Sequence, residues 1–578
     1  MSTSKQPAVR PRLQTRAVPV SLRGYHRAWL GTDVIAGVTL AAVAIPEVLG
    51  YTSISQTPLV TGLYTIIFPT ALFALLGASK LLVVGADSAT AAILAAGLAG
   101  LGISGLTPES PEWVAFCSLT ALVCGALLVL ARLLRLGFLG DFLSASVLIG
   151  FLTGVGIQVA TGQIPGMLGI PKGTGTWFQQ QWHWITSLSD TSVATLCYAV
   201  ATLVIIVGLK RFLPRVPGAL VAVVVLTSVS AATDASANGV SVVGALNGGF
   251  PPIGLPSGIT WADVPKVFAV AFSCFILIIA QSAATSRSFA MKHGDRADIN
   301  RDIVGLAGAS IAAGLSGTFV VNGSPTKTEI LDEQKGRTQL ANLTMAAIAL
   351  IFTLWFTGLL KDMPKAVLDA IVFLIGVNLI DVKGLRRIYA RRRSECVIAL
   401  FTAVVVFAIG VEQGIIVAVV LSILELVRRA YSPKKYVVSI GAGGALDYVK
   451  VQDGAQSEPG LLIFRYDAEL FYANSSLFAD DVERLVTTAP DPVRWVIIDA
   501  GSLDDVDYTA AIAVGGLIDF LHAKGVVFAV AGVDPALLED LKRQDVEKKF
   551  DPTHVYDDVT TAVAAFRAAP AEEPAPRA

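Results

Sequence analysis

The segment VVNGSPTKTE, residues 320–329, interrupts an apolar stretch of the chain with a glycine, three hydroxyl side chains and a lysine. Valines favour an extended backbone, Gly323 permits a turn, and Ser324 and Pro325 suit the cap and the first position of a helix. A helix is therefore predicted to begin here. Its unpaired N–H groups and positive partial charge would bind an anion if the helix began inside a membrane, and Lys327 would add a full charge.

A second segment, VVGADSAT at residues 83–90, has the same plan of valines, glycine, capping residues and an apolar helix. One such break in each half of the apolar sequence indicates an internal repeat with two interrupted helices. For each break alone, an ordinary kink or a loop outside the membrane is the alternative. The candidate anion-binding residues at the two helix starts are Ala86, Ser88, Ala89, Thr90, Gly323, Ser324, Thr326 and Lys327.

The composition predicts a polytopic α-helical membrane protein, because 54% of the residues are hydrophobic and only 15% are charged,. A net charge of −1 favours neither nucleic acid nor an acidic partner,. The basic residues 1–28 lack the apolar core of a secretory signal and are interpreted as a cytoplasmic arm,. The five cysteines have no zinc or disulfide spacing, and we expect no metal site and no cofactor,.

Apolar runs and the short segment from Ser324 predict about 14 membrane elements, two of them discontinuous, within a transmembrane domain at residues 29–430,. Lys and Arg at the span ends place both termini in the cytoplasm. In this topology the two breaks run in opposite directions, so the halves are inverted, with Ser88 and Ser324 facing a shared cavity near the midplane. The predicted runs are residues 33–50, 61–78, 88–102, 113–131, 138–160, 193–209, 217–232, 267–289, 303–318, 340–360, 366–380, 397–411 and 415–427.

The chain beyond Tyr431 alternates short apolar runs with amphipathic helices, which predicts a small α/β domain at residues 460–568,. We expect a linker at 431–459 and a disordered tail rich in Ala, Pro and Glu at 569–578,. The predicted strands are residues 461–465, 495–499 and 526–531, and the predicted helices are 475–488, 508–522, 535–543 and 558–568.

Two motifs resemble the SulP family of sulfate permeases and anion transporters: DVIAG at 33–37 with IPE at 45–47 and GY at 50–51, and GRTQL at 336–340. The C-terminal domain is similar to a cytoplasmic STAS domain. The resemblance covers almost the whole chain. It implies a seven-plus-seven inverted repeat shared with uracil-permease-like transporters, and commonly a homodimer. It also implies an anion held between the third and tenth helix starts and moved by an elevator-like displacement.

Two positions depart from the resemblance: Glu47 stands where many relatives have Gln, and Gln281 where they have an acid. We hypothesise that Glu47 is protonated or cation-paired during transport, with a carboxylate at a water-filled mouth as the alternative. Lys327 is interpreted as balancing anion charge, or as pairing with Glu329 or another acid. Asp87 is interpreted as a helix cap.

The STAS-like domain carries Asp507, Tyr508 and Thr509 where related anti-sigma antagonists have an Asp-Ser-Ser-Gly loop with a phosphorylated serine. Tyr508 replaces that serine, so a structural cap is preferred to kinase switching, and Thr509 remains a remote acceptor.

The sequence lacks a Walker-type phosphate loop and a nucleophile–base set, so we expect no enzyme,. The main hypothesis is a secondary transporter of a small inorganic or carboxylate anion such as sulfate, bicarbonate, chloride or a dicarboxylate, driven by protons, sodium or exchange. An anion channel or a transporter-like sensor that signals through the STAS domain is the alternative, and a nucleobase permease would share the fold.

Overall fold

The computed structural model describes residues 21, 25–103, 105–137, 144–173, 175–213, 216–246, 248–431, 433–441, 445–503, 505–549 and 551–569. The chain forms two compact units, Met1–Ile423 and Leu424–Ala578, and each is described by itself. Most of the predicted N-terminal arm and nearly all of the predicted tail at 569–578 lie outside the described residues.

The first half of the membrane unit is helical, and most of its helices overlap a predicted apolar run, although the run predicted at 138–160 corresponds to a helix that ends eight residues later, at Leu168. The predicted span at 61–78 is divided into two helices, because Pro69 lacks an N–H group and the backbone at Ile67 leaves the helical region with ψ −92°,. The helices are α1 Leu30–Ser55, α2 Leu59–Tyr64, α3 Phe68–Leu76, α4 Ser88–Gly100, α5 Pro111–Leu133, α6 Ala145–Leu168, α7 Trp177–Thr186, α8 Val193–Phe212 and α9 Gly218–Thr233.

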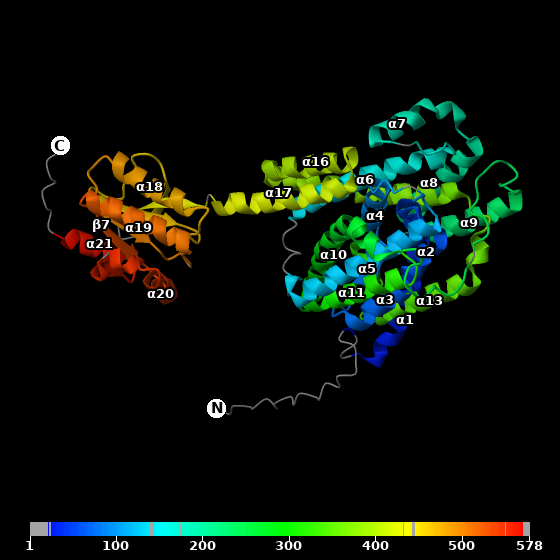
Figure 1. The fold of residues 1–578 in the computed structure, drawn as a ribbon, viewed down its shortest axis with the longest axis horizontal. Helices are drawn as coiled ribbons and strands as arrows, with labels where there is room; N and C mark the ends of the chain where they lie inside the picture. Colours follow the sequence, from blue (N-terminus) through cyan, green and yellow to red (C-terminus); the bar gives the residue numbers. More distant parts are fainter. Residues whose placement is uncertain are drawn as a thin grey trace. The chain divides into compact units, whose positions relative to one another are not determined.

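The second half continues with eight helices, of which α17 crosses the boundary between the units. Figure 1 shows α5, α10 and α11 side by side. Across the described residues, six segments are long and apolar enough to cross a membrane. The helices are α10 Val264–His293, α11 Ile299–Leu315, α12 Pro325–Glu333, α13 Leu340–Trp355, α14 Lys365–Leu379, α15 Val382–Arg391, α16 Arg393–Ala408 and α17 Val411–Tyr431.

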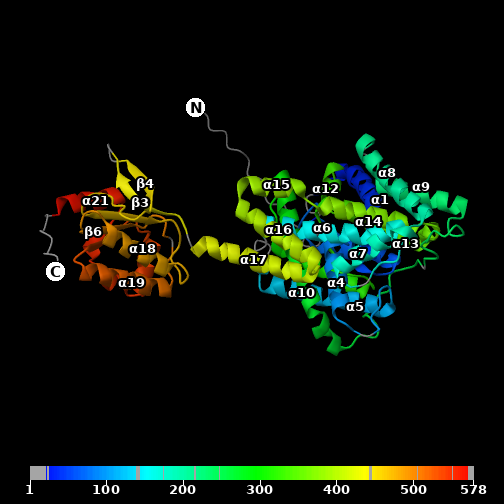
Figure 2. The same cartoon turned by 90° about the horizontal axis from the view of Figure 1, so that it is seen from above.

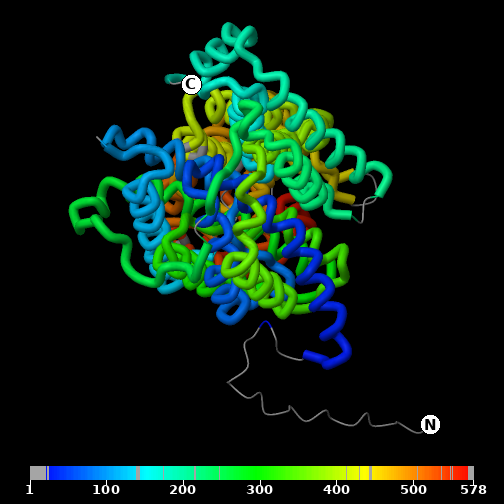
Figure 3. Tube along the Cα trace, turned by 90° about the vertical axis from the view of Figure 1, so that its right-hand side faces the viewer, coloured from blue at the N-terminus to red at the C-terminus, as the bar shows by residue number. Residues whose placement is uncertain are grey.

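Two three-residue strands join the halves of the membrane unit. β1 Val83–Gly85 pairs antiparallel with β2 Asn322–Ser324, with Val84 opposite Gly323, and all six residues are buried. The halves are also interleaved, since α1 packs against α13 and α14, as the tube in Figure 3 shows by its blue and yellow-green segments. Segments more than 200 residues apart in sequence thus build one body.

Two helices of this unit were not predicted. α7 lies between the predicted spans 138–160 and 193–209, in a segment that also contains the last two turns of α6, and α15 lies between the predicted spans 366–380 and 397–411. Both helices have 10 residues and are amphipathic, with one polar and one apolar face, so a search for long apolar runs does not detect them,.

The C-terminal unit is an α/β domain with a six-stranded sheet in the order β4-β3-β5-β6-β7-β8. Strands β5 to β8 are parallel, whereas β3 is antiparallel to β4 and β5. Separate apolar cores cover its two faces, and Figure 2 shows α18 and α19 on one side and α21 on the other. The elements are β3 Lys435–Ile440, β4 Leu446–Lys450, β5 Leu461–Tyr466, α18 Ser475–Thr488, β6 Trp495–Asp499, α19 Tyr508–Ala523, β7 Val527–Ala531, α20 Pro535–Arg543, β8 Val555–Tyr556 and α21 Val559–Ala568.

The prediction of a linker at residues 431–459 is wrong, since this segment contains the strands β3 and β4. These strands extend the sheet at the edge next to β5. β4 is largely exposed and rich in polar residues, so its sequence lacks the apolar signal of a buried strand,.

Candidate functional site

The pairing of β1 with β2 brings the starts of α4 and α12 together. β2 leads directly into α12, and β1 leads into α4 through Ala86 and Asp87, so the antiparallel register fixes one helix start against the other. The N-terminal ends of both helices are therefore next to buried, non-helical backbone. This is the arrangement that exposes N–H groups to an anion inside a membrane protein.

Lys327 lies at the centre of this arrangement, in the first turn of α12, and its side chain is completely buried. Its Nζ donates a hydrogen bond to the carbonyl oxygen of Ala86 at 2.7 Å. It also lies 3.8 Å from Glu47 Oε2 and 4.8 Å from the ring centre of Tyr51. The acid that pairs with Lys327 is therefore Glu47 of α1, and not Glu329.

Asp87 is the N-cap residue of α4. One carboxylate oxygen accepts hydrogen bonds from the backbone N–H groups of Ala89 and Thr90, at 3.1 and 3.4 Å. Thr90 Oγ1 donates in turn to the Asp87 carbonyl at 3.1 Å, and Ser88 is buried beside it. The Asp87 carboxylate thus occupies two N–H groups at the start of α4. An anion bound at this helix start would have to lie beside that carboxylate.

The start of α12 is capped by an uncharged residue. Ser324 Oγ accepts a hydrogen bond from the Lys327 N–H at 3.4 Å and lies 3.2 Å from Thr326 Oγ1. Thr326 is exposed, in contrast to Lys327. The N–H of Gly323 donates to Ser282 Oγ at 3.1 Å, where a Cβ atom would lie only 2.7 Å from that oxygen. A side chain at position 323 would therefore have to displace Ser282 and its hydrogen bond.

Gln281 and Glu47 both contact the site, but they contact different residues of it. The amide of Gln281, on α10, lies 3.5 Å from Asp87 Oδ1 and interacts with the α4 cap. Glu47 Oε2 accepts the Tyr51 hydroxyl at 3.5 Å and faces Lys327 on α12. Gln281 thus contacts the cap of α4, and Glu47 contacts the side chain of Lys327, which reaches Ala86 just before α4.

The two sequence motifs contact each other. Asp33, buried near the start of α1, accepts hydrogen bonds from the Arg337 N–H at 2.7 Å and the Thr338 hydroxyl at 2.6 Å. Gln339 donates to the carbonyls of Ser79 and Leu82, each at 2.9 Å. The second motif therefore connects α1 with the segment that leads into β1.

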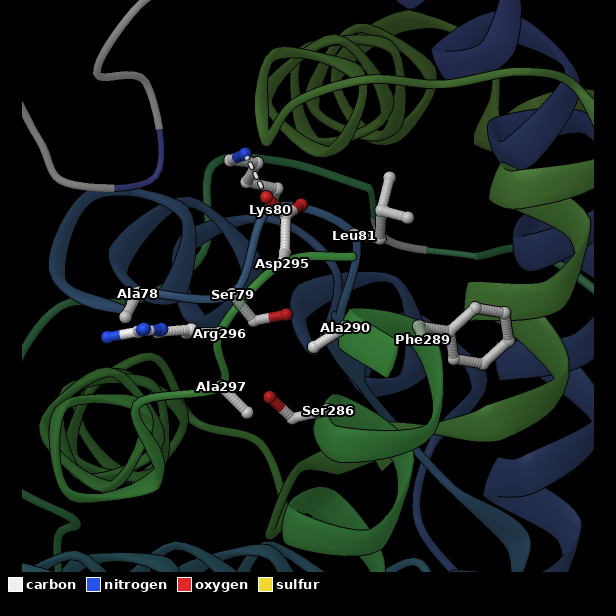
Figure 4. A pocket seen from close by; sticks show the side chains of 10 residues that line it. All are labelled: Ala78, Ser79, Lys80, Leu81, Ser286, Phe289, Ala290, Asp295, Arg296 and Ala297. Atoms are coloured by element: carbon white, nitrogen blue, oxygen red, sulfur yellow. Dashed lines mark hydrogen bonds and ion pairs between the residues drawn. The ribbon is translucent and has the colours of Figure 1, made fainter. Parts of the chain in front are cut away.

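Asp302 of α11 holds the other side of that segment. It accepts the backbone N–H groups of Ala78 and Ser79 at 2.9 and 2.8 Å, and the hydroxyl of Ser286 at 2.7 Å. A small pocket opens here, and Lys80 pairs with Asp295 beside it at 2.7 Å (Figure 4). The approach to β1 is thus fixed from α10, α11 and the second motif together.

Sequence reasoning missed Tyr51 and Asp302 as parts of the site. Tyr51 follows Glu47 by four residues on one helix, so the two side chains share a face, and that spacing was available as a signal,. Asp302 lies at the start of an apolar helix with no motif around it, and only the fold brings it to residues 78–79.

In the C-terminal unit, Asp507 is the N-cap of α19. Its carboxylate accepts the N–H groups of Ala510 at 2.7 Å and Tyr472 at 2.8 Å. Tyr508 and Thr509 follow on the exposed side. The loop therefore has a structural role in starting α19, and its two hydroxyl side chains are accessible.

Comparison with known proteins covers both units. The family model described as the sulfate permease family matches residues 30–402, and the STAS domain model matches residues 454–562. The probable sulfate transporter Rv1739c of Mycobacterium tuberculosis is 34% identical over 95% of this chain and 97% of its own. Solute carrier family 26 member 10 of Mus musculus is 27% identical over 93% of this chain and 84% of its own.

Two solved structures are similar in fold. The murine Slc26a9 anion transporter superposes with a TM-score of 0.85 at 20% identity, over 98% of this chain and 97% of that chain. The transmembrane domain of a cyanobacterial bicarbonate transporter, BicA, has a TM-score of 0.58 at 22% identity, over 69% of this chain and 97% of that chain.

Proposed function

We propose that this chain, which belongs to the sulfate permease family, is a secondary active transporter of a small anion, with sulfate as the first candidate substrate. The family consists of multi-pass membrane transporters of anions, and the chain has the family's transporter fold and STAS domain. Sulfate ranks first because relatives in Mycobacterium tuberculosis are named probable sulfate transporters. Bicarbonate, chloride and dicarboxylates are the other candidates.

The observation that carries the proposal is the position of Lys327. Its buried ammonium group lies between the starts of α4 and α12, hydrogen-bonded to Ala86 and near Glu47. An ammonium group has three donors, and within the described residues its single hydrogen bond is to Ala86,. A substrate anion would use the remaining ammonium donors, because Ser324 already caps the backbone N–H of Lys327.

Charge balance at this site supports cation coupling. Lys327 carries one positive charge, and Glu47 and Asp87 would carry two negative charges if both were ionised. With both carboxylates ionised the site would have a net charge of −1, and adding a dianion to it would be strongly unfavourable in a medium of low dielectric constant. Binding a proton or sodium ion at Glu47 would offset this cost, so Glu47 is the proposed coupling residue and Gln281 is not.

Uptake into proteoliposomes tests the function. The purified full chain is supplied with labelled sulfate, bicarbonate, succinate, chloride or uracil, with and without imposed proton and sodium gradients. A carrier gives saturable uptake that is stimulated by the same anion on the opposite side. Conductance without saturation or trans-stimulation would instead indicate a channel, and no transport of any anion would favour a sensor that signals through the STAS domain.

The variant Glu47→Gln tests the coupling. We expect uptake that no longer responds to the imposed cation gradient, while exchange of anion for anion is retained. Glu112→Gln removes a carboxylate from the exposed start of α5 and is the matched control. Full uptake in Glu47→Gln with an unchanged pH dependence would contradict the coupling role.

The proposal includes the predicted architecture: about 14 spans in a 7+7 inverted repeat with discontinuous third and tenth helices, cytoplasmic termini, and elevator-like alternating access in a homodimer. The antiparallel pairing of β1 with β2 supports the inversion, because the two strands enter their helices from opposite directions. Accessibility of single cysteines introduced at Glu109 and Lys210, to a reagent that cannot cross the membrane, tests the orientation. We expect labelling of intact cells at position 109 and no labelling at position 210.

A further inference from the structure

Basic side chains gather where α15 ends and α16 begins, away from the Lys327 site. Residues 381–395 contain six basic and two acidic side chains. The start of α6 lies beside this junction, since α6 packs against both α15 and α16, as Figure 2 also shows. The basic residues are Lys383, Arg386, Arg387, Arg391, Arg392 and Arg393.

A pocket of 280 Å³ lies between these three helices. α15 contributes Arg387 and Arg391, which are four residues apart and therefore on one face of the helix,. α6 contributes Ser146 from its first turn, and the junction adds Arg392 and Glu395. Three guanidinium groups and the N-terminal end of a helix thus surround one concave space, which is a favourable setting for a phosphate group.

The pocket has an excess of positive charge, although one of its lining residues is an acid. Glu395 accepts a hydrogen bond from Ser146 Oγ at 2.6 Å and lies 3.7 Å from Arg392 Nε. Three arginines and one glutamate give a net charge of +2. Within the part of the chain that the structure describes, neither Arg387 nor Arg391 has a carboxylate at ion-pair distance. The pocket is therefore electrostatically incomplete without an anion.

The pocket lies at the start of α6, which is long and apolar enough to cross a membrane, and this position indicates the source of that anion. Beyond its first turn, α16 exposes an apolar stripe with spacing of three and four residues, which is typical of a lipid-facing helix,. α15 is amphipathic and exposes Val382 and Tyr389 among its arginines, as a helix at a membrane surface does,. The α16 stripe consists of Val397, Leu400, Phe401 and Val404.

We propose that the pocket formed by α6, α15 and α16 binds the phosphate of an anionic phospholipid headgroup. Arg387 and Arg391 contact the phosphate, and the first turn of α6 completes the site. The bound lipid would hold the amphipathic α15 against α6. The site shares no residue with the proposed substrate site, so it does not depend on which anion the protein transports.

Native mass spectrometry of the full chain in a neutral detergent tests this proposal. The protein is titrated with dioleoylphosphatidylglycerol, with dioleoylphosphatidylcholine, or with inorganic phosphate. We expect a saturable phosphatidylglycerol adduct that weakens about 100-fold in R387Q/R391Q, since a direct hydrogen bond between two charged groups contributes about tenfold in affinity. The variant K383Q/R386Q removes the same charge from the same helix outside the pocket, and we expect it to retain the adduct within about threefold of the unaltered chain, because exposed charges without direct contact are screened,.

Two results would overturn the proposal. Equal weakening in the two double variants would mean a general charge effect without a site. Binding of inorganic phosphate that competes fully with phosphatidylglycerol would assign the pocket to a soluble phosphate compound. If R387Q/R391Q fails to fold, the single variants R387Q and R391Q replace it, each with an expected loss of about tenfold.

Discussion

A buried ammonium group with unused donors is expensive unless an anion completes its environment. Lys327 is in this situation, because its hydrogen bond to Ala86 uses one donor and Glu47, at 3.8 Å, is beyond hydrogen-bond distance. The ion pair keeps the charge tolerable when the substrate is absent. When a substrate anion approaches the start of α12, Lys327 would exchange its weak partner, Glu47, for the anion as a stronger partner.

Replacing Lys327 with alanine is expected to weaken anion uptake. A hydrogen bond to a charged group contributes about 1.5–3 kcal/mol, so uptake at low substrate concentration should fall about 10- to 100-fold. Initial rates in proteoliposomes at matched protein content measure the effect. Lys361→Ala, at an exposed lysine, is the control and should not change the rate. Unchanged uptake in Lys327→Ala would mean that the helix ends alone hold the anion.

At the scale of elements, Asp302 holds the segment before β1 by three hydrogen bonds from Ala78, Ser79 and Ser286. Asp302→Ala leaves two backbone N–H groups and a hydroxyl without a partner, each at a cost of about 1–3 kcal/mol. We expect a large drop in thermal stability and in uptake. Asp302→Asn retains an acceptor for both N–H groups and should be much milder. Equal effects of the two variants, measured by thermal unfolding in detergent, would contradict a hydrogen-bonding role.

The packing of α6 on α16 depends on glycine. A Cβ atom at Gly150 would lie 2.1 Å from the carbonyl oxygen of Ala399, which is backbone and cannot move aside cheaply. Gly150→Ala should therefore destabilise the membrane unit by about 1–3 kcal/mol. Gly162→Ala, on the same helix, meets nothing within 4 Å and should be neutral or slightly stabilising,. Thermal unfolding of both variants in detergent measures the difference, and equal melting temperatures would contradict this account.

Long elements were predictable from the sequence because apolar length and breaking residues are local signals. The helix starts at Ser88 and Pro325 and the strand Leu461–Tyr466 follow from them. α15 and β4 were not predicted, since both are short and half-exposed. The sequence could not predict whether Lys327 pairs with Glu329 or with another acid. Its partner, Glu47, is brought near only by the fold, which places α1 beside α12. Contacts across 304 residues, such as Asp33 with Arg337, carry no local signal either.

The C-terminal unit, taken as a whole, has what an independently folding domain requires. Its sheet is covered on both faces by apolar cores whose residues all belong to this unit,. Phe464 of β5 is fully buried and packs against Phe478 of α18, with ring centres 5.6 Å apart. We therefore expect a fragment of residues 424–578 to fold alone and to unfold in one cooperative transition in urea.

Two substitutions within that fragment test whether it is a specifically packed domain or a loosely collapsed one. Phe464→Ala should lower the free energy of unfolding by about 3–5 kcal/mol, because it removes a buried ring and leaves a cavity between the sheet and α18. Tyr508→Ala removes a ring that is 75% exposed and should change the free energy by no more than about 0.5 kcal/mol,. Urea unfolding followed by circular dichroism measures both. A broad transition, or equal losses in the two variants, would mean that the STAS domain acquires its packing only in the complete chain.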